Sequence, residues 1–215
     1  YYCANNTIYG TEWKYIPETG SVPIVCDMSS NMMSKPVDVS KYGIIFAGAQ
    51  KNMAPAGVTL VIVRDDLLGR EMPTTPIMMS YKTMVDKDSM HNTPPCYNIY
   101  MLGLVLKWLD SLGGLKSMEK IKAEKAKLLY DFLAESSLFK SPVRPDSRSD
   151  MNVPFVTGDE ALDKRFVKEA EAAGLVNLAG HRTVGGMRAS IYNAMPIEGV
   201  KALVEFMKDF EVKNK

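Results

Sequence analysis

Two side chains of opposite charge follow neighbouring apolar runs in this sequence. Asp27 is the last residue of the run at 22–27, and Lys51 comes a few residues after the run at 43–47. In open α/β sheets, ligands bind beyond the carboxyl ends of the strands. If both runs are strands, a carboxylate and a lysine therefore lie at the same edge of a sheet. This pair suits pyridoxal phosphate (PLP) chemistry, in which a lysine forms a Schiff base and a carboxylate pairs with the pyridinium nitrogen.

A second group of residues suits the binding of anions. His181, Arg182 and Arg188 lie within a short segment near the end of the sequence. A guanidinium group binds carboxylates and phosphates through paired hydrogen bonds. The whole chain is nearly neutral, with 26 Lys and Arg residues against 25 Asp and Glu residues. This balance gives no electrostatic footprint for nucleic acid or an anionic membrane surface. Any anion binding must therefore depend on a few placed side chains.

The same residues also have ordinary structural interpretations. A loop lysine is most often a solvated surface residue, and an aspartate at a strand end often caps a turn. Each arginine is equally suited to a structural ion pair, and His181 to a structural hydrogen bond. Spacing and charge alone therefore leave PLP binding as one hypothesis beside a purely structural role.

Short apolar runs predict strands in the first half of the chain. The runs at 22–27, 43–47 and 58–64 have strand length, and polar or turn residues bound each of them. Strands that are apolar almost throughout are typical of a sheet covered on both faces. The first half therefore predicts the core of an α/β domain.

A helix is expected after the polar, proline-rich stretch at 73–95. Asn92 or Thr93 is a suitable N-cap for this helix, which we place at 97–112. Its residues are apolar almost all round, and that pattern predicts a well-buried helix.

The remaining residues predict a smaller α+β domain. Apolar residues at helical spacing alternate there with short strand-like runs. We expect helices at 115–136, 159–173 and 196–211 and strands at 151–156 and 186–192.

The cysteines favour a reducing, cytoplasmic compartment. Cys3, Cys26 and Cys96 are odd in number, lie far apart and show no C-x-x-C spacing. This pattern argues against a disulfide framework and against a structural zinc site. We expect no bound metal, no transmembrane helix and no signal peptide.

Three long segments carry a family resemblance. They are CDMSSNMMSKPVDVSKYGIIFAGAQKN, HNTPPCYNIYMLGLVLKWL and GHRTVGGMRASIYNAMP. The sequence resembles the phosphoserine aminotransferases, which are fold-type I PLP enzymes of the class V aminotransferase family. The resemblance covers essentially all 215 residues. It implies that residues 1–114 are the remainder of a large PLP-binding domain, with a mostly parallel sheet and helices on both faces. Residues 115–215 would form the small C-terminal α+β domain.

The resemblance also implies roles at the cofactor. Lys51 matches the lysine that forms the Schiff base with PLP and later acts as general acid and base. Asp27 matches the partner of the pyridine nitrogen. Gln50 matches a position at the cofactor phosphate, and Thr7 matches one near the ring hydroxyl.

Further matches imply substrate binding and a shared active site. Asn92 and Thr93 match a pair that reaches the PLP phosphate of the neighbouring subunit, which implies a homodimer whose active sites are shared. His181 and Arg182 match residues that hold the substrate's phosphate. Arg188 matches the arginine that binds the substrate α-carboxylate.

The reaction implied by the resemblance is transamination in serine biosynthesis. L-glutamate and 3-phosphohydroxypyruvate would give 2-oxoglutarate and O-phospho-L-serine, and a related role in pyridoxine biosynthesis is also implied. Two alternatives stay open. One is another class V PLP enzyme, such as a cysteine desulfurase or an alanine–glyoxylate type transaminase. The other is an inactive fragment or a dimerisation module, because the family carries an N-terminal part, including a ring-stacking aromatic, that we expect to be missing before Tyr1.

Overall fold

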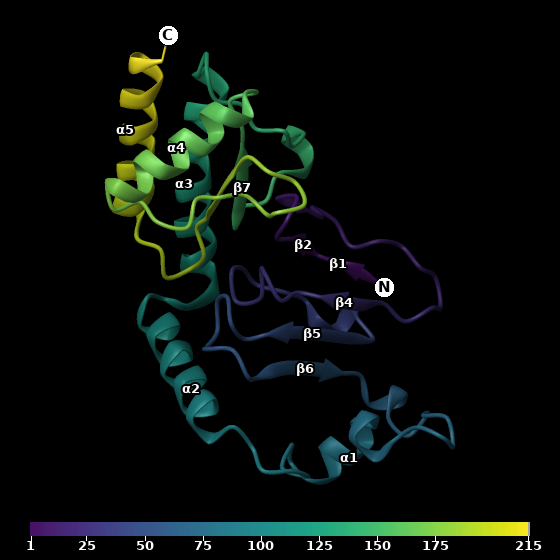
Figure 1. Cartoon of the computed structure of the whole chain (residues 1–215). Coiled ribbons are helices and arrows are strands. Elements are labelled where there is room, and N and C mark those ends of the chain that lie inside the picture. The colour runs from purple at the N-terminus through teal and green to yellow at the C-terminus, as the bar shows by residue number, and fades with distance from the viewer. Residues whose placement is uncertain (215) are drawn as a thin grey trace.

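The computed structural model in Figure 1 describes residues 1–214 and contains a four-stranded mixed sheet in its lower part. The strand order is β1-β4-β5-β6; β1, β4 and β5 are parallel, and β6 is antiparallel to β5. The strands are β1 (Tyr2–Cys3), β4 (Val25–Asp27), β5 (Ile44–Gly48) and β6 (Thr59–Val63). The α/β fold class and the three strands predicted in this half are confirmed, although β4 begins later than expected.

A short hairpin near the N-terminus crosses to the other part of the molecule. It pairs β2 (Asn5–Asn6) with β3 (Thr11–Glu12). In its turn, the Asn6 side chain accepts hydrogen bonds from the backbone N–H groups of Ile8 and Tyr9, both at 3.0 Å. Gly10 has a φ of +64°, and a Cβ at this position would lie 2.2 Å from Cδ of Pro154. The turn therefore reaches β7 only because this residue is glycine.

The C-terminal part packs three helices against a two-stranded antiparallel sheet. Its elements are α3 (Gly114–Glu135), β7 (Asn152–Phe155), α4 (Glu160–Ala172), β8 (Met187–Ser190) and α5 (Ile197–Lys213). Each of these elements was predicted, and the ends agree to within two residues. Apolar periodicity locates such elements well, because each presents one face to a shared core.

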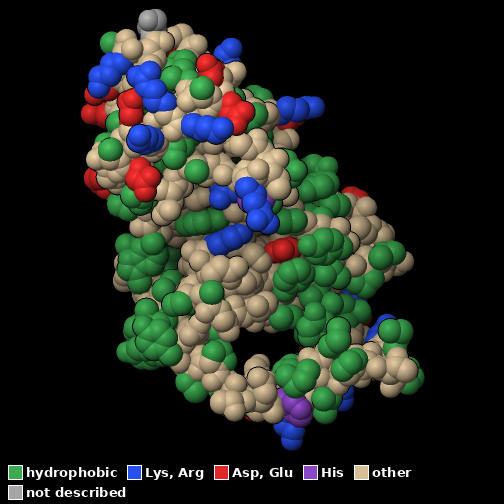
Figure 2. Space-filling view, viewed as in Figure 1, with side chains coloured by type: hydrophobic (Ala, Val, Ile, Leu, Met, Phe, Trp, Pro, Cys, Tyr) green, Lys and Arg blue, Asp and Glu red, His purple; other side chains and the backbone are tan. Residues whose placement is uncertain are grey.

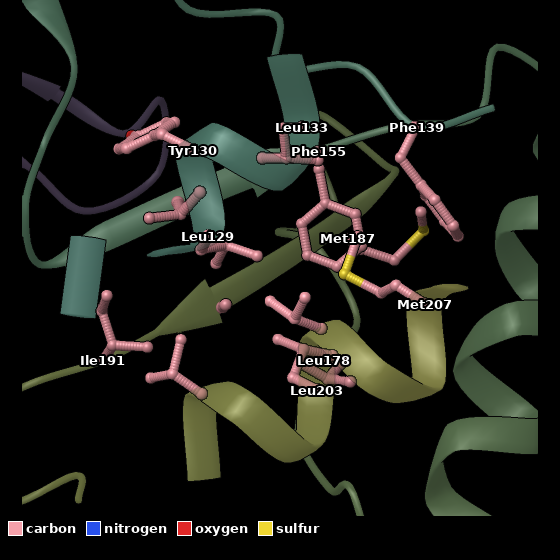
Figure 3. Packing of buried hydrophobic residues seen from close by; sticks show 14 of the residues in the cluster. Leu129, Tyr130, Leu133, Phe139, Phe155, Leu178, Met187, Ile191, Leu203 and Met207 are labelled. Carbon is pink, nitrogen blue, oxygen red and sulfur yellow. The ribbon is translucent and has the colours of Figure 1, made fainter. Parts of the chain in front are cut away.

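Two separate hydrophobic clusters lie in the described part of the chain. In the C-terminal cluster, Leu129 comes from α3, Phe155 from β7 and Leu203 from α5, and Figure 3 shows these side chains converging. The other cluster surrounds β4 and β5 and includes the fully buried Cys26 and Ile45. Two clusters suit a chain of two units, and the boundary between residues 114 and 115 stays a prediction.

The helix α2 (Cys96–Ser111) is far more exposed than its sequence predicted. Of residues 96–111, Leu109 alone is buried, while Tyr97 and Tyr100 are more than 60% exposed. The expectation of a well-buried helix is therefore wrong for this chain. A helix that is apolar all round is buried only where neighbours surround it, and here α3 and the sheet contact part of its surface. Its N-cap is Pro95, with no side-chain cap, so the proposed capping by Asn92 or Thr93 is also wrong.

The remaining elements are short. A helix that the sequence pattern did not predict, α1 (Tyr81–Asp86), interrupts the proline-rich stretch, and Ser80 caps it. The 3-10 helices are η1 (Val39–Lys41), η2 (Asp65–Leu67), η3 (Ile77–Met79) and η4 (Pro145–Ser147). Within residues 1–214, no helix combines the length and the apolar character needed to cross a membrane.

Candidate active site

Asp27 and Lys51 lie at the same edge of the main sheet. Asp27 ends β4, and Lys51 follows the end of the parallel strand β5. The Asp27 carboxylate accepts a hydrogen bond from the backbone N–H of Ser29 at 2.8 Å. The Ser29 hydroxyl in turn accepts one from the N–H of Gly48 at 3.0 Å. These two bonds hold the carboxyl ends of β4 and β5 together.

The Lys51 side chain points to the hairpin turn. Its ammonium donates a hydrogen bond to the Thr7 hydroxyl, and the residue is half-buried. Burial lowers the pKa of Lys51; the nearby Asp27 carboxylate opposes this shift, and the Arg188 guanidinium adds to it. An amine with a lowered pKa loses its proton more readily than a surface lysine, and only the neutral amine is a nucleophile.

Gln50 folds back over the end of β5. A Cβ at Gly48 would lie 2.6 Å from Oε1 of Gln50 and 3.1 Å from its Nε2. The amide therefore occupies the space that a larger residue at position 48 would fill. This arrangement places a polar, exposed group at the end of β5, directly before Lys51 in the chain.

Arg188 reaches the same place from the C-terminal part of the molecule. It lies on β8, opposite Pro154 of β7, and its Nη1 donates a hydrogen bond to the Thr7 carbonyl at 3.1 Å. Its Nε is buried and has no hydrogen-bond partner among residues 1–214. Thr7 thus lies between a lysine and an arginine, and the arginine keeps one buried donor available.

His181 and Arg182 lie in a tight loop that leads into β8. A Cβ at Gly180 would lie only 2.0 Å from the carbonyl oxygen of Gly185, so the two ends of the loop touch only because position 180 is glycine. Nδ1 of His181 and the Thr183 hydroxyl are 2.7 Å apart and share a hydrogen bond. The Arg182 side chain is exposed. On the face shown in Figure 2, basic side chains gather at the junction of the two parts of the molecule, next to an acidic one.

Asn92 and Thr93 do not join this group. Both are exposed in the segment between α1 and α2, which runs along the bottom of Figure 1. Nδ2 of Asn92 donates a hydrogen bond to the Thr93 carbonyl at 3.4 Å. Their predicted role at a neighbouring subunit stays a prediction.

The sequence pattern missed the network that aligns the two parts. Nδ2 of Asn5, on the hairpin, donates to Oδ1 of Asn152 on β7 at 3.0 Å. Nδ2 of Asn152 donates to the hydroxyls of Ser190 and Tyr192 at 3.1 and 3.0 Å. Because Asn5 and Asn152 are fully buried, these bonds fix Thr7 relative to Arg188. Asparagines far apart in the sequence give no local signal of such a network.

The family model for aminotransferase class-V matches residues 1–203 of this chain. The chain belongs to the class V aminotransferase family. It is 58% identical over 211 residues to a phosphoserine aminotransferase from Laribacter hongkongensis (strain HLHK9), with 98% of this chain and 58% of that protein aligned. The structure of phosphoserine aminotransferase from Bacillus circulans subsp. alkalophilus superposes with a TM-score of 0.97 at 47% identity, over 99% of this chain and 59% of that one.

A PLP-bound phosphoserine aminotransferase from Trichomonas vaginalis is also similar in structure. Its TM-score is 0.92 at 42% identity, and the match covers 96% of this chain and 59% of that one. The chain therefore spans about three fifths of the length of these relatives. The class V match contains every residue of the candidate site, from Thr7 to Arg188.

Proposed function

We propose that this chain contributes to a PLP-dependent aminotransferase that acts in serine biosynthesis. It would move the amino group of L-glutamate to 3-phosphohydroxypyruvate, with O-phospho-L-serine and 2-oxoglutarate as products. A single observation carries the proposal: Thr7 joins Lys51 and Arg188 at the edge of the sheet where Asp27 lies. The similarity to proteins named phosphoserine aminotransferase supports the choice of substrates, and a related role in pyridoxine biosynthesis belongs to the same proposal.

The residues at this edge fit PLP. Lys51 supplies an amine whose pKa is lowered by burial, Asp27 a carboxylate oriented by Ser29, and Gln50 an amide donor. Asp27 would hold the ring nitrogen, Gln50 the cofactor phosphate and Thr7 the region of the ring hydroxyl. When bound, PLP supplies a place for the electrons of the substrate's α-carbon.

Lys51 would move the proton in this reaction. Its Nζ would take the proton from the α-carbon of the amino donor and, in the second half-reaction, give a proton to the α-carbon of the amino acid that is formed. Thr7 accepts a hydrogen bond from this nitrogen and so restricts where it points. A partly buried amine suits both directions of transfer, because its pKa lies nearer to neutral pH than that of a surface lysine.

The basic residues of the C-terminal part would hold the substrate's anionic groups. Arg188 would bind the α-carboxylate that both substrates share, and its buried Nε is a donor that such a carboxylate would satisfy. His181 and Arg182 would bind the phosphate of the keto acid or the distal carboxylate of glutamate.

We further propose a homodimer in the cytoplasm. Asn92 and Thr93 would contribute to the partner's PLP phosphate site, which agrees with their exposure away from Lys51. The exposed apolar face of α2 supports a covering partner of this kind. The three free cysteines, Cys3, Cys26 and Cys96, would suit a reducing compartment.

Reductive labelling tests the role of Lys51. The protein is loaded with PLP, reduced with borohydride and digested, and the peptides are identified by mass. We expect the pyridoxyl group on Lys51 and no labelled peptide from Lys51→Ala. Lys41→Ala, at an exposed lysine near the same sheet, is the matched control and should label normally. Undiminished labelling of Lys51→Ala would show that another lysine carries the cofactor.

Turnover of matched keto acids tests the substrate. With glutamate as the amino donor, 3-phosphohydroxypyruvate should react far faster than hydroxypyruvate, and Arg182→Ala should reduce that preference. Equal turnover of the two keto acids would favour another class V activity. A protein that binds PLP at Lys51 but transfers no amino group would favour the inactive-fragment hypothesis.

A further inference from the structure

A buried ammonium organises the loop that follows β8. Lys125, on α3, is fully buried. Its three N–H donors are shared among four backbone carbonyl oxygens of the loop at 191–195. The distances are 3.2 Å to Ile191, 2.8 Å to Tyr192, 3.4 Å to Asn193 and 2.8 Å to Met195.

This lysine has a costly environment for a charge. Burial lowers the pKa of Lys125 to about 8, and within residues 1–214 its ammonium donates its hydrogen bonds to carbonyl groups. Charge-assisted hydrogen bonds are stronger than neutral ones, and the carbonyl dipoles replace the water that a surface ammonium would bind. A single side chain therefore gathers carbonyls that would otherwise point apart around a tight bend.

The same loop contacts the segment that carries Lys51. The backbone N–H of Asn193 donates to Oδ1 of Asn52 at 3.0 Å. Nδ2 of Asn193 donates to the Met33 carbonyl at 2.8 Å, and Nδ2 of Asn52 donates to the Met32 carbonyl at 2.9 Å. Met33 has a φ of +62°, a left-handed conformation that is uncommon for this residue type. Asn52 is the residue directly after Lys51.

We propose that Lys125 is a positioning residue for Lys51. By gathering the carbonyls of the loop at 191–195, its ammonium presents Asn193 to Asn52 and so fixes the Lys51 turn relative to β8, which carries Arg188. The relevance to catalysis rests on the role proposed above for Lys51. The mechanical connection stands on the contacts alone.

A neighbouring lysine provides a matched control. Lys122 lies about one turn earlier on α3 and is also buried, but its ammonium pairs with the Asp150 carboxylate at 2.7 Å. Lys122→Met therefore removes a buried ammonium from the same helix without touching the loop at 191–195. Lys125→Met removes the same group where the loop depends on it.

Amide hydrogen exchange in the full-length protein, without cofactor, tests the connection. The N–H groups of Met53 and Ala54 both bond to the Ala49 carbonyl, at 3.1 and 2.8 Å, so they report on the turn that holds Lys51. In Lys125→Met, exchange of these amides and of the Asn193 amide should rise about tenfold or more. Lys122→Met should leave the Met53 and Ala54 amides unchanged.

A double variant distinguishes positioning from general loosening. If Lys125 acts through the bond from the Asn193 N–H to the Asn52 side chain, Asn52→Ala removes that connection. Adding Lys125→Met to Asn52→Ala should then raise exchange at Met53 and Ala54 no further than Asn52→Ala does. Faster exchange confined to 191–195, or equal effects of the Lys122 and Lys125 variants, would overturn the proposal. If Lys125→Met does not fold, Lys125→Gln, which keeps two N–H donors, takes its place under the same criteria.

The proposal and the function can fail separately. Borohydride labelling reports which lysine holds PLP, and the exchange experiment needs no cofactor. If PLP labels another lysine but the exchange results are as expected, only the functional interpretation fails. If PLP labels Lys51 but Lys125→Met leaves exchange at Met53 and Ala54 unchanged, only the positioning role of Lys125 fails.

Discussion

Replacing Asn152 by leucine should loosen the junction between the hairpin and the C-terminal sheet. Asn152 is fully buried on β7 and pairs in register with Ser190 of β8. Its side chain accepts one hydrogen bond from Asn5 and donates two, to Ser190 and Tyr192. Leucine has the same number and branching of side-chain heavy atoms, so Asn152→Leu removes the hydrogen bonds while keeping the branched shape of the side chain.

The expected cost follows from these bonds. Each buried hydrogen bond contributes about 1 kcal/mol net, so three lost bonds amount to about 3 kcal/mol. Asn5 keeps its bond to the Ser30 hydroxyl at 2.8 Å, which limits the cost on that side. A loss of about 3 kcal/mol in the opening free energy of β7 and β8 raises their amide exchange on the order of a hundredfold.

Amide exchange of β7 and β8 is the suitable assay, because it measures this region without assuming that the whole protein unfolds in one step. Tyr192→Phe supplies an internal control: it removes one of the same acceptors, so it should cost less in the Asn152→Leu background than in the wild type. A change below about 1 kcal/mol in Asn152→Leu, or full additivity with Tyr192→Phe, would refute the reasoning. Either result would mean that water reaches these groups or that the bonds contribute little.

Three further predictions concern the core, the acid stability and the substrate site. Phe139 is fully buried, with its ring centroid 5.1 Å from that of Phe166, so Phe139→Ala should lower the free energy of unfolding by about 3–5 kcal/mol in urea titrations; a loss under about 1 kcal/mol would mean that the cavity collapses. Glu12 is buried, and Oε1 of its carboxylate lies 2.7 Å from Nζ of Lys35. Burial raises the pKa of Glu12, but Lys35, Lys14 and Lys122 together lower it by more, so the net shift is downward. A carboxylate with a lowered folded-state pKa stabilises the protein above its ordinary value of 4.5, and that contribution is lost as the pH falls through the folded-state pKa. Glu12→Gln should therefore flatten the acid limb of the Tm-against-pH curve, and an unchanged slope would contradict this. Arg188→Lys should raise KM for glutamate about tenfold, because a lysine lacks the paired donors of a guanidinium; an unchanged KM would exclude Arg188 as the carboxylate-binding group.

Local patterns were enough to predict much of this molecule. Asp27 and Lys51 were expected at one sheet edge because parallel strands end on the same side, and the structure has them there. The elements after residue 114 also followed from apolar periodicity, because each has one clear face toward the core. The pattern was misleading at α2, since a helix that is apolar all round does not indicate which of its faces is covered.

The sequence by itself determined the family, the α/β class, the order of most elements and the residues that suit PLP chemistry. These features depend on local spacing or on motifs that are contiguous along the chain. Only the tertiary structure decided that Thr7 lies between Lys51 and Arg188, that Asn152 ties the hairpin to the C-terminal sheet, and that Lys125 organises the loop reaching Asn52. The physical reason is that these hydrogen bonds join polar groups between 44 and 181 positions apart, and such pairs have no periodicity that a sequence can display.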